Sequence, residues 1–156
     1  MSAKTELLRR VRDAIADVRS DEFPGFEQVH LHEPKQVAYA RSAWIWYGGE
    51  QEQGMTLGQV LREESFPLRC YWRETDGTHE ELERIELELV AAHAAIKAAL
   101  WGEVEQRGDD PSLTLLPGLA ETGYEEMQVG PDLVQVFRVL RIPLTLQDLE
   151  GEEIAR

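Results

Sequence analysis

The chain has 156 residues, 42% of them hydrophobic, which is enough apolar material for one compact domain and argues against a disordered chain. Its formal net charge of −14 argues against sequence-independent binding to nucleic acid, because an acidic surface repels phosphate, although the same acidity also serves solubility alone. No apolar run approaches the roughly 20 residues that span a bilayer. No signal peptide precedes the first amphipathic segment, so we expect a cytoplasmic protein. Cys70 is the only cysteine, which excludes an internal disulfide.

The first half of the chain predicts one helix followed by three strands. Residues 4–19 are predicted to form an amphipathic helix because their apolar side chains recur at helical spacing. Between the second and third strands, the polar residues 48–54 predict a loop, while residues 55–65 fit either a short helix or an extended arm. The three strands, rich in alternating, aromatic or β-branched residues, are predicted at 29–32, 43–47 and 66–72.

A long helix is predicted over residues 78–101, where Thr78 and Glu81 have the spacing of a capping box. This helix carries two apolar stripes on nearly opposite sides. A single sheet buries only one of them, so we expect the other to contact another part of the chain or a neighbouring subunit. The alternative is that its alanines are helix formers on a solvated face. The stripe expected on the sheet consists of Leu82, Ile85, Leu89, Ala92, Ile96 and Leu100, and the second stripe of Leu87, Ala91, Ala94, Ala98 and Trp101.

The last third of the chain predicts a closing strand pair. Residues 121–129 and 133–146 are expected to pair around the turn Gly130-Pro131-Asp132, and both faces of the last strand are partly apolar, so we expect both to be covered. A short strand or turn is expected at 113–119. The sequence thus predicts one α+β domain over residues 1–146, with a mostly antiparallel sheet of four to five strands, two main helices packed on it and a long hairpin loop, followed by an acidic tail over residues 147–156.

No residue pattern predicts catalysis, a cofactor or a metal ion. His30 and His32 lie on the same side of a predicted strand, but two imidazoles without further ligands are better explained as solvent-facing side chains. Cys70 lacks a basic setting and is expected to be a small buried hydrophobic residue. Adjacent carboxylates, as in Glu80-Glu81, are expected to be solvated. The tryptophans lack the basic groove of a base-stacking platform, and aromatic packing explains them better.

Three segments resemble those of the tail terminator, or tail completion, proteins of long-tailed bacteriophages. Residues 66–72 resemble the central strand of that family. Residues 96–101, a polar loop and residues 110–113 resemble the end of its helix and the re-entry into the sheet. Residues 124–146 resemble its terminal hairpin, with a phenylalanine at the centre of the last strand.

The resemblance implies a structural virion protein rather than an enzyme. Proteins of this family form a hexameric ring that caps the tail tube, ends tube polymerisation and joins the tail to the head connector. The implied partners are copies of the chain itself, the tail tube protein and the head–tail connector protein, with DNA passing through without specific binding and no membrane involved. The implied location is the head-proximal end of the virion tail, after assembly in the host cytoplasm.

On this interpretation the second helix stripe contacts the adjacent subunit or the first helix. The loop from Gly48 to Glu64 lines the channel, and its carboxylates give a wall to which DNA does not adhere. The expected channel-facing residues are Glu50, Glu52, Glu63 and Glu64.

Two other interpretations remain open. The first is another head–tail connector or neck protein, which would share the size, acidity and fold type. The second is a small cytoplasmic α+β module that binds a ligand or regulates an enzyme. Such a module needs a pocket, for which Trp44, Trp46 and Trp72 are the first candidates.

Overall fold

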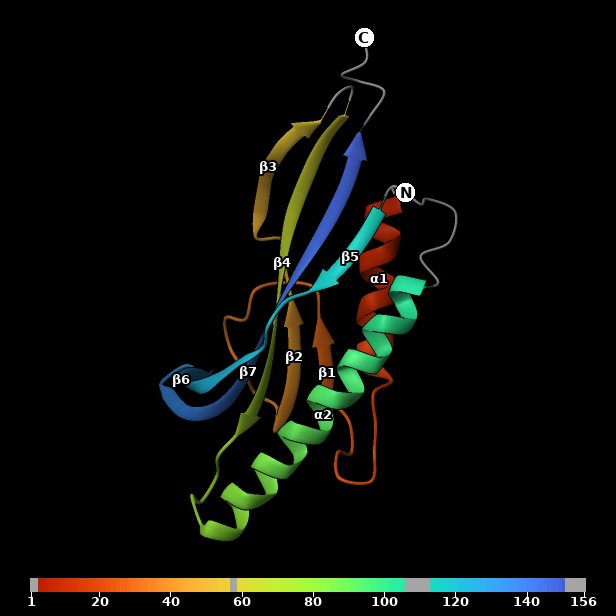
Figure 1. The fold of residues 1–156 in the computed structure, drawn as a ribbon. Coiled ribbons are helices and arrows are strands. Elements are labelled where there is room, and N and C mark those ends of the chain that lie inside the picture. Colours follow the sequence, from red (N-terminus) through yellow and green to blue (C-terminus); the bar gives the residue numbers. More distant parts are fainter. Residues whose placement is uncertain (1–2, 57–58, 106–112, 151–156) are drawn as a thin grey trace.

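Two long antiparallel strands, β4 (Gln59–Arg73) and β7 (Leu133–Glu150), form the centre of the fold (Figure 1). They pair in unbroken register from Val60 opposite Glu150 to Arg73 opposite Phe137. The computed structural model describes residues 3–56, 59–105 and 113–150. The remaining elements are α1 (Ala3–Ala16), β1 (Gln28–His30), β2 (Arg41–Ile45), β3 (Gly49–Thr56), α2 (His79–Glu105), β5 (Leu113–Pro117) and β6 (Glu121–Gly130).

The other strands add to both sides of this central pair. The main order is β1-β2-β4-β7-β5, while β3 pairs with β4 beyond the end of β2, and β6 pairs with β7 beyond the end of β5. Among the strands of the described residues, only the β1–β2 pair is parallel. The predicted α+β fold with a mostly antiparallel sheet is therefore confirmed in outline, but the described chain has seven strands rather than four to five.

Both helices cover one face of the sheet, and the main core lies beneath them (Figure 1). Strand alternation directs Cys70 and Trp72 of β4 and Leu140 and Ile142 of β7 into this core. The α2 residues predicted to face the sheet are buried, apart from the half-buried Leu82. Neither helix of the described chain combines the length and the apolarity that a bilayer-spanning segment needs.

A smaller apolar cluster covers the opposite face of the sheet. Trp44 and Tyr71 meet Phe137 there, with Val37 packed against them. The segment between β1 and β2 folds over this face, and the backbone N–H of Val37 donates to the carbonyl oxygen of Gln128 at 2.8 Å. The expectation that both faces of the last strand are covered is thus confirmed from Phe137 onward, where the second face is closed by the β6–β7 hairpin and residues 31–40. It is wrong for the start of the strand, where Leu133, Val134 and Val136 are exposed.

The predicted loop and tail contain strands instead. The expected polar loop at residues 48–54 lies mostly in β3, and β7 continues to Glu150 into the predicted tail. Of the two alternatives for residues 55–65, the extended one is confirmed for the described residues, which belong to the end of β3 and the first part of β4. Their polar side chains lack the apolar alternation typical of a strand, but backbone pairing of β4 with β3 and β7 stabilises the extended conformation, with one irregularity in the β3–β4 pair between Glu52 and Met55. Residues 151–156 of the predicted tail lie outside the described residues.

The start of α2 is fixed by two caps. The Thr78 hydroxyl accepts a hydrogen bond from the backbone N–H of Glu81 at 3.2 Å, as the capping box predicts. The Glu81 carboxylate reaches further back than expected and accepts bonds from the backbone N–H groups of Thr75 (2.9 Å) and Gly77 (3.1 Å). Glu81 is therefore a buried structural carboxylate, and the prediction of a solvated Glu80-Glu81 pair is wrong for Glu81.

A second buried carboxylate joins α2 to the sheet. Glu88 is 4% exposed and accepts hydrogen bonds from Arg41 of β2 and from Arg84 one helical turn earlier. Burial alone would raise the pKa of the Glu88 carboxyl, but the hydrogen bonds and positive charges of Arg41 and Arg84 outweigh it and lower that pKa.

Replacing Glu88 with Gln is expected to destabilise the fold by about 3 kcal/mol, because Arg41 keeps its charge and loses its buried partner. The lowered folded-state pKa means that the Glu88 contribution is present above the unfolded-state pKa and is lost as pH falls through the folded-state pKa. Urea unfolding of both chains between neutral and acid pH measures this difference. The matched control is Glu86→Gln on the same helix, where the carboxylate that pairs with Arg138 is 47% exposed and the expected loss is below about 1 kcal/mol. Equal losses for the two variants would contradict the assignment.

Candidate functional site on the outer face of α2

The outer face of α2 exposes large apolar side chains in a row. Leu87 is 64% exposed, Val90 65% and Trp101 63%. Of the predicted stripe, Ala94 and Ala98 are also exposed, while Ala91 is half-buried and packs against the main core. We call Leu87, Val90, Ala94, Ala98 and Trp101 the α2 stripe.

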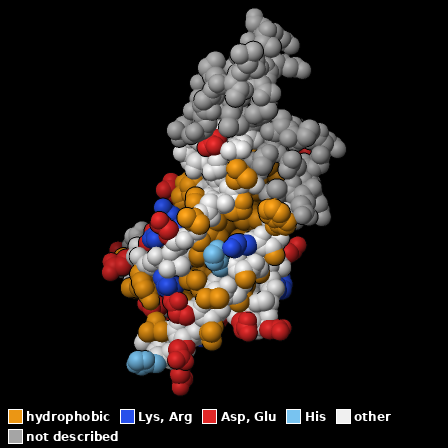
Figure 2. Space-filling model, viewed as in Figure 1, with side chains coloured by type: hydrophobic (Ala, Val, Ile, Leu, Met, Phe, Trp, Pro, Cys, Tyr) orange, Lys and Arg blue, Asp and Glu red, His pale blue; other side chains and the backbone are white. Residues whose placement is uncertain are grey.

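The α2 stripe lies opposite the buried face of the same helix. At 100° per residue its members cluster on the side away from Ile85, Leu89 and Ile96, all of which are buried. Figure 1 shows α2 as the longest element of the helix layer, and Figure 2 shows hydrophobic side chains spread across the middle of the same view. A single copy of the chain therefore leaves an apolar strip of this helix in water.

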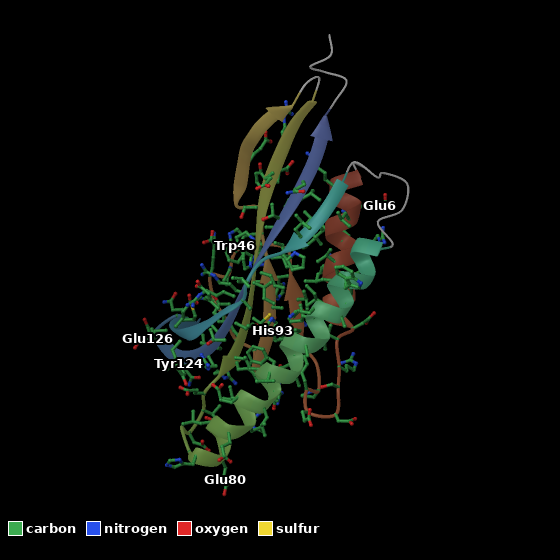
Figure 3. All side chains as sticks on the ribbon, viewed as in Figure 1. Glu6, Trp46, Glu80, His93, Tyr124 and Glu126 are labelled. Atoms are coloured by element: carbon green, nitrogen blue, oxygen red, sulfur yellow. The ribbon has the colours of Figure 1, made fainter. Side chains whose placement is uncertain are left out.

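The N-terminal half of α2 also borders a shallow groove. Its volume is about 520 Å³, and Leu82 and Leu87 line it together with Glu83, Glu86 and His79. Figure 3 marks this end of the helix with Glu80 and the middle of the helix with His93. The groove continues the α2 stripe toward the start of the helix and offers an apolar floor with an acidic rim.

Val90 is the one member of the α2 stripe that sequence reasoning missed. It follows Leu87 by three residues, a spacing that places two side chains on one helix face. The sequence thus contained a signal for Val90, but the regular spacing of the alanines led to the choice of the next residue, Ala91, instead.

The predicted channel-facing carboxylates do not share one surface. Glu63 and Glu64 are neighbours in β4, so they point to opposite faces of the sheet. Glu64 is buried in an ion pair with Lys4 of α1, and Glu63 accepts a hydrogen bond from Gln147 at 2.9 Å. Glu50 is exposed in β3, and the side chain of Glu52 lies outside the described residues. Of the four, only Glu50 is shown with a carboxylate open to solvent.

The three tryptophans considered for a pocket lie on both faces of the sheet. Trp72 packs with Phe23 and Phe26 in the main core, whereas Trp44 and Trp46 belong to the second face. Figure 3 labels Trp46 on the side of the sheet away from α1 and α2. Alternation along β2 and β4 explains the separation, so these side chains do not form one ligand pocket.

The sequence predicted a solvent-facing His30, but in the structure this side chain is partly buried. Its ring stacks on Trp44 with centroids 4.4 Å apart, and the His32 ring lies 5.1 Å from it. Partial burial lowers the pKa of His30, and the nearby His32 lowers it further, so the neutral ring is favoured. Within residues 3–56, 59–105 and 113–150, no three His, Cys, Asp or Glu side chains lie in an arrangement that could hold a metal ion.

Cys70 is fully buried in the main core, as predicted. Burial raises the pKa of its thiol, so the thiolate needed for nucleophilic attack is disfavoured. Cys70 therefore acts as a small apolar residue in the core.

An ionic cluster on the second face was not predicted from the sequence. Arg69 of β4 and Arg141 of β7 stand directly opposite each other, and the Glu125 carboxylate lies between them, 2.9 Å from Arg141 Nη2 and 3.5 Å from Arg69 Nη1. The Arg69 guanidinium also stacks on the Trp46 ring, 5.2 Å from its centroid. A groove of about 240 Å³, walled by Pro67 and Pro143, opens beside the two arginines. The sequence could not reveal this cluster, because it depends on the long-range register of β4, β6 and β7.

Comparison with known proteins does not assign the chain to a family. A scan against protein-family models finds no match, and a search of curated proteins finds no significantly similar sequence.

Glu125→Gln is expected to destabilise the fold by about 1–2 kcal/mol, because Arg69 and Arg141 then face each other without a shared anion. Added salt screens the repulsion between the two guanidinium groups, so the loss should shrink as ionic strength rises. Urea unfolding at low and high salt measures both effects. The neighbouring Glu126 is exposed, so Glu126→Gln should change stability by less than about 0.5 kcal/mol. A deficit that does not respond to salt would contradict the electrostatic explanation.

Proposed function

We propose that this chain is a structural protein of a long-tailed phage virion, a tail terminator whose copies form a hexameric ring. The ring caps the tail tube, ends tube polymerisation and joins the tail to the head connector. The observation that carries the proposal is the α2 stripe, an apolar helix face that one folded copy leaves exposed. The family is proposed because the central strand, the helix end and the terminal hairpin resemble those of tail terminators.

The charge of the chain supports a passive role beside DNA. With a net charge of −14, the surface repels phosphate, so DNA passes through the ring without specific binding. Glu50 of β3 is the described carboxylate with an open position from which to face such a channel. The ring belongs at the head-proximal end of the tail and assembles in the host cytoplasm.

Other roles fit parts of the structure. Another head–tail connector or neck protein would use the same exposed helix face, and the identity of the tail partner separates the two. A small ligand-binding module is favoured only by the groove beside Arg69 and Arg141, which offers two guanidinium groups to an anion. No enzymatic role is proposed.

Ala94→Glu is expected to abolish ring formation, because it places a charge in the centre of the α2 stripe and leaves it desolvated in the contact. The association constant should fall at least about 100-fold, equivalent to about 3 kcal/mol. Light scattering over a concentration series distinguishes a ring from single chains of 17.8 kDa. The matched control is Ala38→Glu, the same substitution at an exposed alanine of the segment between β1 and β2.

The assembly test also includes tail tubes, because a terminator can remain monomeric in solution and form its ring only when it meets the tube. A wild-type chain that stays monomeric at every concentration and also fails to bind or to stop growing tubes would refute the proposed function. Unchanged assembly of the Ala94→Glu variant would refute the α2 stripe as the contact while leaving the ring itself in place.

A further inference from the structure

The first helix is basic in an otherwise acidic chain. Residues 1–20 contain five of the 16 Lys and Arg residues and only three of the 30 Asp and Glu residues. Arg9 and Arg19 are exposed, and Arg12 is half-buried with its side chain 36% exposed. The α1 region therefore offers a local positive surface to which acidic segments of this same chain are attracted.

Two of these arginines line a groove at the edge of the sheet. The groove has a volume of about 460 Å³, with Arg12 and Arg19 on the α1 side and Phe26 and Val29 on the strand side. Ala16 also lines the groove, whose surface is more polar than apolar. The groove thus combines two guanidinium groups with a small apolar surface.

The acidic side chains that border this groove already have partners. Asp13 accepts a hydrogen bond from Arg12 Nε at 3.0 Å, and Glu27 accepts one from the backbone N–H of Ala40 at 3.1 Å. Arg19 donates to the carbonyl oxygen of Pro24 at 3.2 Å. A guanidinium group has five N–H donors, so these bonds leave donors on Arg12 and Arg19 for an incoming carboxylate.

The groove runs beside an open strand edge. β1 lies at the end of the sheet and pairs only with β2 among the described strands. Its outer edge can accept the backbone of an extended segment by strand addition. The preferred occupant is therefore an extended acidic peptide that carries an apolar side chain.

We propose that this groove binds residues 150–154 of a neighbouring copy of the chain. That segment reads Glu150-Gly151-Glu152-Glu153-Ile154, so it supplies carboxylates for Arg12 and Arg19 and an apolar side chain for the small apolar surface. The inference rests on the proposed self-assembly and names a second, head-to-tail contact between neighbours.

The same copy cannot supply this segment. Glu150 pairs with Val60, whereas β1 is aligned through β2 with β4 residues 69–71. About nine residues of β4 separate the two levels, or roughly 30 Å along the strand. The residues that follow Glu150 up to residue 156 span at most about 20 Å when extended. The occupant must therefore come from another copy.

The test uses a fluorescent peptide of residues 147–156, titrated with the full-length chain and followed by anisotropy. We expect saturable binding that weakens at least about tenfold with Arg12→Glu or with Arg19→Glu. Arg9→Glu is the matched control, because it makes the same charge change on the same helix outside the groove. A peptide carrying Glu153→Lys should bind wild type weakly and regain affinity for the Arg12→Glu chain, as a charge-swap cycle requires.

The outcomes separate this inference from the proposed function. Absence of peptide binding, or an equal loss with Arg9→Glu, overturns the groove as the docking site. A chain truncated after Glu150 should associate more weakly than the full chain, and unchanged association also overturns the inference. Peptide binding by a chain that never forms rings would instead support the groove and refute the ring. Ring formation that is lost with Ala94→Glu, by a chain that does not bind the peptide, would support the ring and refute the groove.

Discussion

The rest of the structure depends on the antiparallel pairing of β4 and β7. Each strand is far longer than the roughly five or six residues typical of globular proteins, and their register is continuous from Val60 to Arg73. One half of the pair forms the floor of the helix-covered core. The other half extends past β2 with β3 at its side (Figure 1). Because both strands continue without a break from the core into the extension, packing in the core fixes the position of the extension.

The pairing also explains why the sheet is covered on two faces. Alternation along β4 sends Cys70 to the helix side and Tyr71 to the other side, and β7 repeats the pattern with Leu140 and Val139. A strand that is apolar on both faces needs cover on both. The helices provide it on one face, and the curled β6–β7 hairpin with residues 31–40 provides it on the other. The ion pair between Arg138 of β7 and Glu86 of α2 then joins the hairpin to the helix layer.

Local patterns predicted the two helices and the closing β6–β7 hairpin, but not the register of strands that lie far apart in the sequence. The apolar spacing on α2 and the Thr78 cap were readable because each depends on residues three or four positions apart. The extended polar part of β4 was not readable, since its strand conformation comes from backbone bonds to β3 and β7 rather than from its own side chains. The burial of Glu64 and Glu88 was not predicted for the same reason: each is stabilised by a cation from a distant element, Lys4 and Arg41 respectively. The α2 stripe was predicted except for Val90, because an apolar face without a partner is visible in one helix alone.

The distribution of exposed groups bears on how copies of the chain can meet. A twofold contact uses the same patch on both copies, so a uniformly acidic patch would face another acidic patch across it. A head-to-tail contact avoids this, because it brings different patches together. The described surface offers such different patches: an apolar stripe on α2 and a basic region on α1, in a chain whose net charge is −14. Repulsion within so acidic a chain disfavours random association, and an arrangement that joins the basic region of one copy to an acidic segment of the next reduces it. Such a contact is directional, and when it is repeated it closes into a ring if the rotation closes and otherwise builds an open filament. The uneven distribution of charge along the chain therefore supports a head-to-tail contact, the type of contact that the proposed ring requires.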